Sequence, residues 1–207
     1  VQPKSMVVIG GGVIGCEFAS ILNSLGTKIS VIEMMPKLLG NMDQSLADAV
    51  AKDFASSGID VELSSKVLRV EDADGKKKVV FEKNGKEACK EAEYVLVSTG
   101  RKANSAGLGL ETLGMELVKG FIKVDDHMKT NIPGIYAAGD ITGQGMLAHT
   151  AFEGGTVAVE NIAGGNRTLD LKAVPKVVFV SNEVASVGMT EEEAKAAGYE
   201  VISGVFS

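Results

Sequence analysis

The stretch that decides the fold is Val7-Val8-Ile9-Gly10-Gly11-Gly12-Val13-Ile14-Gly15. The continuous apolar run from Met6 to Ile9 is typical of a strand that is covered on both faces of a parallel sheet. Glycines follow directly, and from Ile14 apolar residues recur at helical spacing up to Gly26, a common left-handed helix terminator. The stretch therefore predicts a strand, a tight turn and a helix in immediate succession.

The next elements repeat this alternation. A second strand is expected over Lys28–Glu33, a helix from about Asp43 to Gly58, and a short third strand over Ile59–Leu63. Two consecutive crossovers favour an α/β fold with a Rossmann-like, doubly wound sheet.

The periodicity then changes to short stretches separated by Asp-Gly and Asn-Gly, which are typical of hairpin turns. An inserted antiparallel β-meander is expected from Lys66–Glu71, Lys77–Lys83 and Lys86–Ala92. A buried strand at Glu93–Thr99 then returns to the parallel sheet and ends at Gly100.

The remainder of the chain predicts separate pieces. A strand is expected over Ile135–Ala138, a helix over His149–Ala163, and a strand over Val177–Val180. Thr190 and Glu193 have the spacing of a capping box, which predicts a last helix over Glu191–Ala197. We therefore divide the chain at residues 1–125, 126–168 and 169–207, the last being the unfinished start of a further α+β domain.

Composition limits the partners and the compartment. The 207 residues carry a formal charge of −6, no long apolar window, and one dense basic run, Lys76-Lys77-Lys78, so neither a nucleic-acid nor a membrane partner is expected. Cys16 and Cys89 lack the spacing of a redox pair, which favours a reducing compartment: the cytoplasm, or the mitochondrial matrix in a eukaryote. The amino terminus has no initiator Met and enters a strand at once, so a piece of a longer protein is expected.

The glycine pattern carries the clearest chemistry. Gly10 permits a tight turn, Gly12 admits a pyrophosphate close to the backbone, and Gly15 lets the helix pack on the strand. Glu33 follows at roughly the 20-residue spacing of an acid that accepts hydrogen bonds from an adenosine ribose, and no arginine follows it for a 2′-phosphate. The pattern predicts NAD rather than NADP. The alternatives are that the glycines only form a tight turn and that Glu33 is only a solvated acid at the end of a strand.

A wider set of motifs indicates a family. Four segments in this order resemble the pyridine nucleotide-disulfide oxidoreductases: Val7–Glu17, Val97–Asn104, Thr130–Asp140 and Met146–His149. With Glu33 and Glu153-Gly154-Gly155, the last of them is more similar to the dihydrolipoamide dehydrogenase branch than to glutathione or mercuric reductases. The resemblance identifies residues 1–125 as an NAD-binding domain, 126–168 as part of an FAD-binding domain, and 169–207 as the start of a dimerisation domain.

The resemblance also implies cofactor-binding residues. For NAD these are Gly10, Gly11, Gly12, Val13, Ile14, Gly15 and Glu17, with Glu33, Val67 and Gly100 at the adenosine half. FAD is expected only in the full-length protein, and its residues here are Asp140 at the ribityl chain and Met146, Leu147, Ala148 and His149 at the pyrimidine edge. Purely structural roles remain as alternatives. Val67 could be a core residue of a strand, Glu17 an acid in the early turns of a helix, and Asp140 a capping or turn residue.

The catalytic apparatus of the family is not expected in this chain. It contains no second GxGxxG, no paired cysteines and no histidine after His149, whose implied role is binding through its backbone. His127 has poor spacing for a metal, and Cys16 could have a lowered pKa at the helix start but is more simply a packing residue. Ser181-Asn182 stands where the family commonly has His-Pro, with no consequence that the sequence reveals.

Three functions remain open. The first is the NAD-binding fragment of a homodimeric flavoprotein that oxidises dihydrolipoamide, borne by lipoyl subunits of 2-oxoacid dehydrogenase or glycine cleavage complexes, through a disulfide and FAD to NAD. The second is an NADH oxidase or another FAD- and NAD(P)-dependent disulfide reductase of the superfamily. The third is a stand-alone NAD-sensing module without catalysis.

Overall fold

The computed structural model describes residues 2–206, which form two compact units. The first unit combines the chain up to Gly100 with the chain from Lys176 onward, and the second unit is Arg101–Pro175. These units are groups of residues that pack together, and they do not test the domain boundaries expected at residues 125 and 168. The three-domain division stays a prediction.

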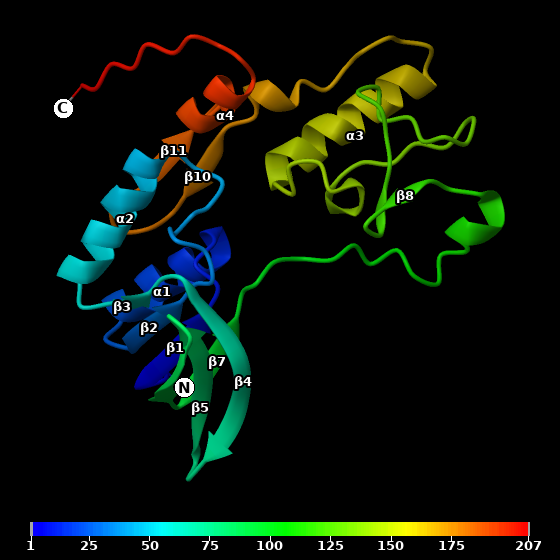
Figure 1. Cartoon of the computed structure of the whole chain (residues 1–207). Helices are drawn as coiled ribbons and strands as arrows, with labels where there is room; N and C mark the ends of the chain where they lie inside the picture. The colour runs from blue at the N-terminus through cyan, green and yellow to red at the C-terminus, as the bar shows by residue number, and fades with distance from the viewer. Residues whose placement is uncertain (1, 207) are drawn as a thin grey trace. The chain divides into compact units, whose positions relative to one another are not determined.

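The first unit is built on a parallel sheet, as the sequence predicts (Figure 1). The strands lie in the order β3-β2-β1-β7 and all run parallel. The elements are β1 (Ser5–Ile9), α1 (Val13–Ser24), β2 (Lys28–Ile32), α2 (Gln44–Ser56), β3 (Asp60–Glu62) and β7 (Tyr94–Val97). The expected β-α-β-α-β succession is confirmed.

The expected meander is also present. It consists of β4 (Ser65–Ala73), β5 (Lys76–Lys83) and β6 (Lys86–Ala92), which pair in antiparallel fashion. Asp74-Gly75 and Asn84-Gly85 both have positive φ, the conformation that the tightest hairpin turns require. The Asp-Gly and Asn-Gly signals therefore mark the turns correctly.

Each face of the sheet is covered by a different layer. Val8 and Val31 point to the side where they pack with Cys16 of α1 and Phe54 of α2. Val7, Ile9 and Ile32 point to the other side and pack with Val79, Phe81 and Ala92 of the meander. Burial on both faces explains why the sequence of β1 is continuously apolar.

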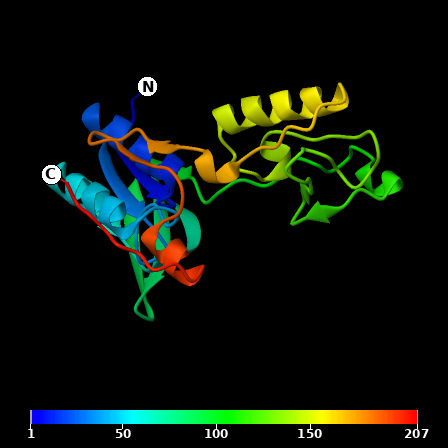
Figure 2. The ribbon, with the colours of Figure 1, turned by 90° about the horizontal axis from the view of Figure 1, so that it is seen from above.

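The carboxyl-terminal segment joins the helical layer of the first unit. It contains β10 (Lys176–Val178), β11 (Val184–Ser186) and α4 (Glu191–Ala196), and both strands lie beside α1 and α2 in two views (Figures 1 and 2). Val178, Val180 and Val184 are buried in the same core as α1 and α2. Thr190 and Glu193 form the predicted capping box at α4.

The second unit has little sheet. It contains η1 (Leu110–Leu113), the short hairpin β8 (Leu117–Val118) and β9 (Phe121–Ile122), η2 (Asp140–Thr142), α3 (Ala148–Ile162) and η3 (Leu171–Ala173). Figure 2 shows α3, in yellow, along one side of this unit. The predicted helix at 149–163 is confirmed. No helix within residues 2–206 is long and apolar enough to cross a membrane.

The strand predicted over Ile135–Ala138 is wrong. Only Tyr136 makes a bridge, to Lys129, across the Pro133-Gly134 turn. Met128 has φ +63°, so the partner backbone turns away directly after this bridge. An apolar run becomes a strand only when a neighbouring backbone continues beside it, and here the neighbouring backbone does not.

Candidate functional site

Two glycines of the loop after β1 are fixed by close packing. Gly10 has φ +108°, and a Cβ atom there would lie 2.6 Å from the carbonyl oxygen of Ser98. A Cβ atom at Gly15 would lie 1.9 Å from the carbonyl oxygen of Gly10. The first and last glycines of the motif therefore bring β1, β7 and α1 together, in the turn and packing roles that the sequence predicts.

Gly12 has a different environment. Within residues 2–206, no atom beyond its two chain neighbours lies within 4 Å of the position that a Cβ atom would take there. Gly12 is the N-cap of α1, no side chain caps the helix, and its first turn contains no acid. The first N–H groups of a helix have no intrahelical acceptor, and the helix dipole adds positive potential, so this uncapped end suits an anion.

The Glu33 carboxylate lies beside the same loop. Its two oxygens accept hydrogen bonds from the backbone N–H groups of Gly11, at 2.5 Å, and Met35, at 2.7 Å. The backbone of Glu33 is in turn fixed by its N–H bond to the carbonyl of Glu62 on β3. The acid that the sequence places at the end of β2 thus stands at the edge of the glycine loop.

Ser98 supports this loop, although spacing alone does not reveal it. Its hydroxyl lies 3.0 Å from the carbonyl oxygens of both Ile9 and Gly10. The residue belongs to the Val97–Asn104 segment quoted for the family resemblance, but its contact depends on the parallel pairing of β1 with β7. Only knowledge of this long-range strand pairing reveals the role of Ser98.

Three further residues predicted for NAD lie on other parts of the first unit. Glu17 on α1 accepts a hydrogen bond from the backbone N–H of Phe179, at 3.0 Å. Val67 is half-buried against the meander core, and Gly100 has φ +119°, a conformation that favours glycine. Glu17 is therefore in contact with the carboxyl-terminal segment.

Cys16 is a packing residue of α1. Its side chain is fully buried, and its thiol lies 3.3 Å from the carbonyl oxygen of Gly11. Burial, and then the charges of Glu33 and Glu17, raise the pKa of Cys16 to about 12. A position at a helix start could lower the pKa of Cys16, but the shift has the opposite direction because desolvation of the thiolate dominates.

The residues predicted for FAD lie in the second unit. Asp140 opens η2 and pairs with Arg101 at 3.7 Å, and both line a cavity of about 260 Å³ with Met146. Leu147 is the N-cap of α3, which has no side-chain cap and no acid in its first turn. The structure thus brings Asp140 and Met146 to one cavity and leaves the N–H groups that begin α3 available.

The two histidines have backbone partners. One ring nitrogen of His127 lies 2.9 Å from the carbonyl oxygen of Arg167, and one of His149 lies 2.9 Å from that of Pro175. Within residues 2–206, no group of three or more His, Cys, Asp and Glu side chains could hold a metal ion.

The chain matches a known family over most of its length. The family described as pyridine nucleotide-disulphide oxidoreductase matches residues 1–155, and the dimerisation domain of the same enzymes matches residues 174–207. The chain belongs to this oxidoreductase family. The resemblance seen in the four motifs is confirmed.

Several curated relatives of this oxidoreductase chain are dihydrolipoyl dehydrogenases. That of Chlamydia muridarum is 41% identical over 96% of this chain, and that of Bacillus subtilis is 37% identical over 99%. A mercuric reductase of Bacillus cereus is 38% identical over 98% of the chain. The chain spans 42%, 44% and 32% of these three relatives, less than half of each.

Two solved structures share the fold of this oxidoreductase chain. LpdA from Mycobacterium tuberculosis has a TM-score of 0.86 at 30% identity, covering 95% of this chain and 43% of its own. The HOCl-induced reductase RclA from Escherichia coli has a TM-score of 0.85 at 29% identity, covering 97% and 46%. The α/β fold with a parallel sheet is thus that of the family.

Proposed function

We propose that the first unit binds NAD. The observation that carries the proposal is the uncapped start of α1 at Gly12, directly beside the Glu33 carboxylate. The helix start would receive the pyrophosphate from residues 10–15, while Glu33 would accept hydrogen bonds from the adenosine ribose. Val67 and Gly100 would flank the adenosine, and Glu17 the nicotinamide end.

NAD is preferred over NADP in this proposal because of charge. A 2′-phosphate would meet the Glu33 carboxylate, whose hydrogen bonds from Gly11 and Met35 hold it in place. Met34, Met35 and Pro36 follow it and supply no cation. Repulsion without a compensating arginine disfavours the phosphorylated nucleotide.

We also propose an FAD contact in the second unit. Asp140 would accept hydrogen bonds from the ribityl chain, and the backbone of Met146, Leu147, Ala148 and His149 would lie at the pyrimidine edge. The free N–H groups at the start of α3 fit a ring that gains negative charge on reduction. When bound, FAD would supply the electron transfer between the dinucleotide and a disulfide.

For the whole protein we propose oxidation of dihydrolipoamide, with NAD as acceptor. The dihydrolipoyl dehydrogenase relatives support this substrate, which makes the lipoyl-bearing subunits of 2-oxoacid dehydrogenase or glycine cleavage complexes the proposed partners. The dimerisation-domain match supports a homodimer. In this proposal the chain is a central fragment, inactive alone, of a cytoplasmic enzyme.

Another disulfide reductase of the family is the second candidate. The mercuric reductase relative favours it, because at 38% identity it is as similar to this chain as several dihydrolipoyl dehydrogenases. The fold match to RclA, at 29% identity, agrees with it. The two candidates share the NAD and FAD contacts proposed here. They differ in the substrate, which residues outside this chain would select.

Nucleotide binding to the 207-residue chain tests the proposal. NADH should bind more tightly than NADPH in equilibrium titrations, and Glu33→Ala should narrow the difference. Glu93→Ala removes an acid whose carboxylate accepts a hydrogen bond from the backbone N–H of Lys4. It is the matched control and should leave the difference unchanged. Equal affinities for the two nucleotides in the parent chain would exclude the role of Glu33.

A further inference from the structure

The loop between β2 and α2, residues 34–43, packs against the glycine loop. The N–H of Leu39 donates a hydrogen bond to the carbonyl of Gly11, at 2.9 Å. A Cβ atom at Gly11 would lie 2.5 Å from a methyl carbon of Leu38, so the two loops are in van der Waals contact. Leu38, Leu39 and Met42 are almost fully buried. The 34–43 loop therefore fixes one side of the proposed nucleotide site.

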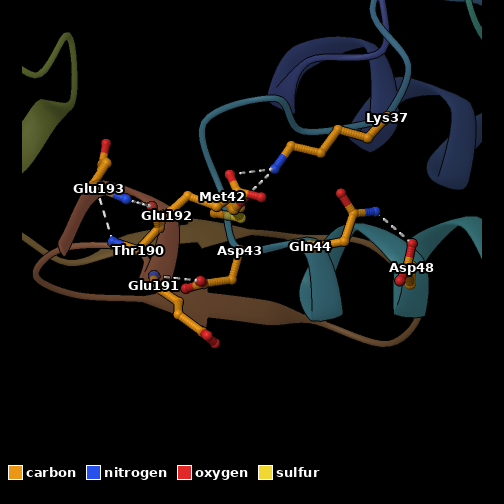
Figure 3. Close-up of polar contacts among 9 residues, drawn as sticks. All are labelled: Lys37, Met42, Asp43, Gln44, Asp48, Thr190, Glu191, Glu192 and Glu193. Atoms are coloured by element: carbon orange, nitrogen blue, oxygen red, sulfur yellow. Dashed lines mark hydrogen bonds and ion pairs between the residues drawn. The ribbon is translucent and has the colours of Figure 1, made fainter. Parts of the chain in front are cut away.

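The far side of this loop is held by the carboxyl-terminal segment. The ammonium of Lys37 donates to the carbonyl of Met42, at 2.9 Å, and pairs with the carboxylate of Glu192 on α4, at 3.4 Å (Figure 3). The Lys37 side chain is only 15% exposed, whereas that of Glu192 is 66% exposed. A mostly buried lysine side chain thus bonds within the loop and connects the loop to α4.

Asp43 makes a second connection at the end of the loop. It occupies the N-cap position of α2, but its side chain does not cap that helix. Its carboxylate accepts a hydrogen bond from the backbone N–H of Glu191, at 2.9 Å, beside the Thr190–Glu193 capping box (Figure 3). The acid at the N-cap position of α2 therefore bonds to the start of α4, at a residue 148 positions later in the chain.

We propose that Lys37 and Asp43 are positioning residues for the dinucleotide, through which the carboxyl-terminal segment sets the affinity of the nucleotide site. The proposal rests on the NAD site proposed above. Neither residue touches the nucleotide in it. They act through Leu38, Leu39 and the backbone of Gly11, which also holds the Glu33 carboxylate.

The physical reason is preorganisation. A binding loop that is already ordered loses less conformational entropy when the ligand arrives, so its affinity is higher. The ion pair and the hydrogen bond order the 34–43 loop before binding. Because coupling between two equilibria is reciprocal, bound NADH should also stabilise the docking of α4.

The first experiment compares variants of the 207-residue chain by NADH titration. Lys37→Ala and Glu192→Ala should each weaken NADH binding by about two- to fivefold, the factor that the loss of a partly exposed ion pair corresponds to. Lys37→Arg should restore the affinity, since guanidinium also donates to a carbonyl and a carboxylate. Lys195→Ala removes a side-chain ion pair with Glu191 within α4 but leaves the backbone N–H of Glu191 that bonds to Asp43, and should bind NADH like the parent.

Hydrogen exchange distinguishes local loosening of the 34–43 loop from a general loss of stability. In Lys37→Ala the amide of Leu39 should exchange faster, while amides in the centre of β1 should keep their protection. A double-mutant cycle between Lys37 and Glu192 should show coupling in the NADH affinity. Variants that melt earlier but bind NADH with the parent affinity would overturn the proposal.

The two proposals fail in different ways. If the parent chain binds neither NADH nor NADPH, the NAD site itself is wrong, and the positioning role is wrong with it. If the parent chain binds NADH and both alanine variants match it, only the positioning role is wrong.

Discussion

A Cβ atom at Gly15 would lie 1.9 Å from the carbonyl oxygen of Gly10. Because that oxygen belongs to the backbone, the clash cannot be relieved by a rotamer change. We expect Gly15→Ala to lower the free energy of unfolding by roughly 1–3 kcal/mol, the cost of overpacking a tight contact. Chemical denaturation followed by circular dichroism measures this change.

Gly12→Ala is the matched substitution, with a smaller expected loss of stability. Within residues 2–206 its Cβ atom would meet no atom beyond its chain neighbours, so the free energy of unfolding should fall by only about 0.5–1 kcal/mol, the preference for glycine over alanine at an N-cap position. NADH affinity should fall about tenfold, equivalent to about 1.4 kcal/mol, because the methyl group occupies the path of the pyrophosphate. Unchanged NADH affinity in a folded Gly12→Ala chain would argue against a nucleotide at this loop.

The two cysteines should react at very different rates. Cys16 is buried with its pKa raised to about 12, whereas Cys89 is exposed on β6. At pH 8 the native chain should expose one thiol to an aromatic disulfide reagent, and the unfolded chain two. Cys89→Ser should abolish the fast reaction. Rapid modification of Cys16 in the native chain would contradict its burial.

Asn182 should anchor the carboxyl-terminal segment to α2. Its side-chain amide donates to the carboxylate of Asp53 at 2.6 Å, and Ser181 donates from its backbone to the hydroxyl of Ser20 at 3.0 Å. Asn182→Ala should lower the free energy of unfolding by roughly 0.5–1.5 kcal/mol. In a chain that already carries Asp53→Ala, Asn182→Ala should lower the free energy of unfolding by less. Thermal denaturation of the parent, the two single variants and the double variant measures this difference.

Glu62 should make stability depend on acid. The hydrogen bond from Lys83 lowers the pKa of Glu62 below its ordinary value, and Lys90 lowers it further. A carboxyl with a lowered folded pKa contributes stability that is complete above its ordinary pKa of about 4.3 and is lost as pH falls through the folded value. Glu62→Gln should therefore flatten the decline of the unfolding free energy below pH 4.3. An equally steep decline would contradict the pairing.

The helices and strands of the first unit follow from local signals. The apolar run before Gly10, the Asp-Gly and Asn-Gly turns, and the Thr190–Glu193 box each predict an element that the structure contains. The strand expected at Ile135–Ala138 fails because pairing depends on a second backbone, and Met128 turns that backbone away. Local pattern predicts an element best where a helix or hairpin satisfies its own hydrogen bonds.

The sequence by itself determined the glycine loop, the acid at its edge and the family, because the turn conformation, close packing and charge that these require are written in residue types at short spacing. Tertiary structure alone decided that Ser98 supports Gly10, that Cys16 is too buried to ionise readily, and that Lys37 and Asp43 bind α4. These relationships join residues far apart in the chain. They exist only once hydrophobic burial has brought β1, β7 and the carboxyl-terminal segment together around one core.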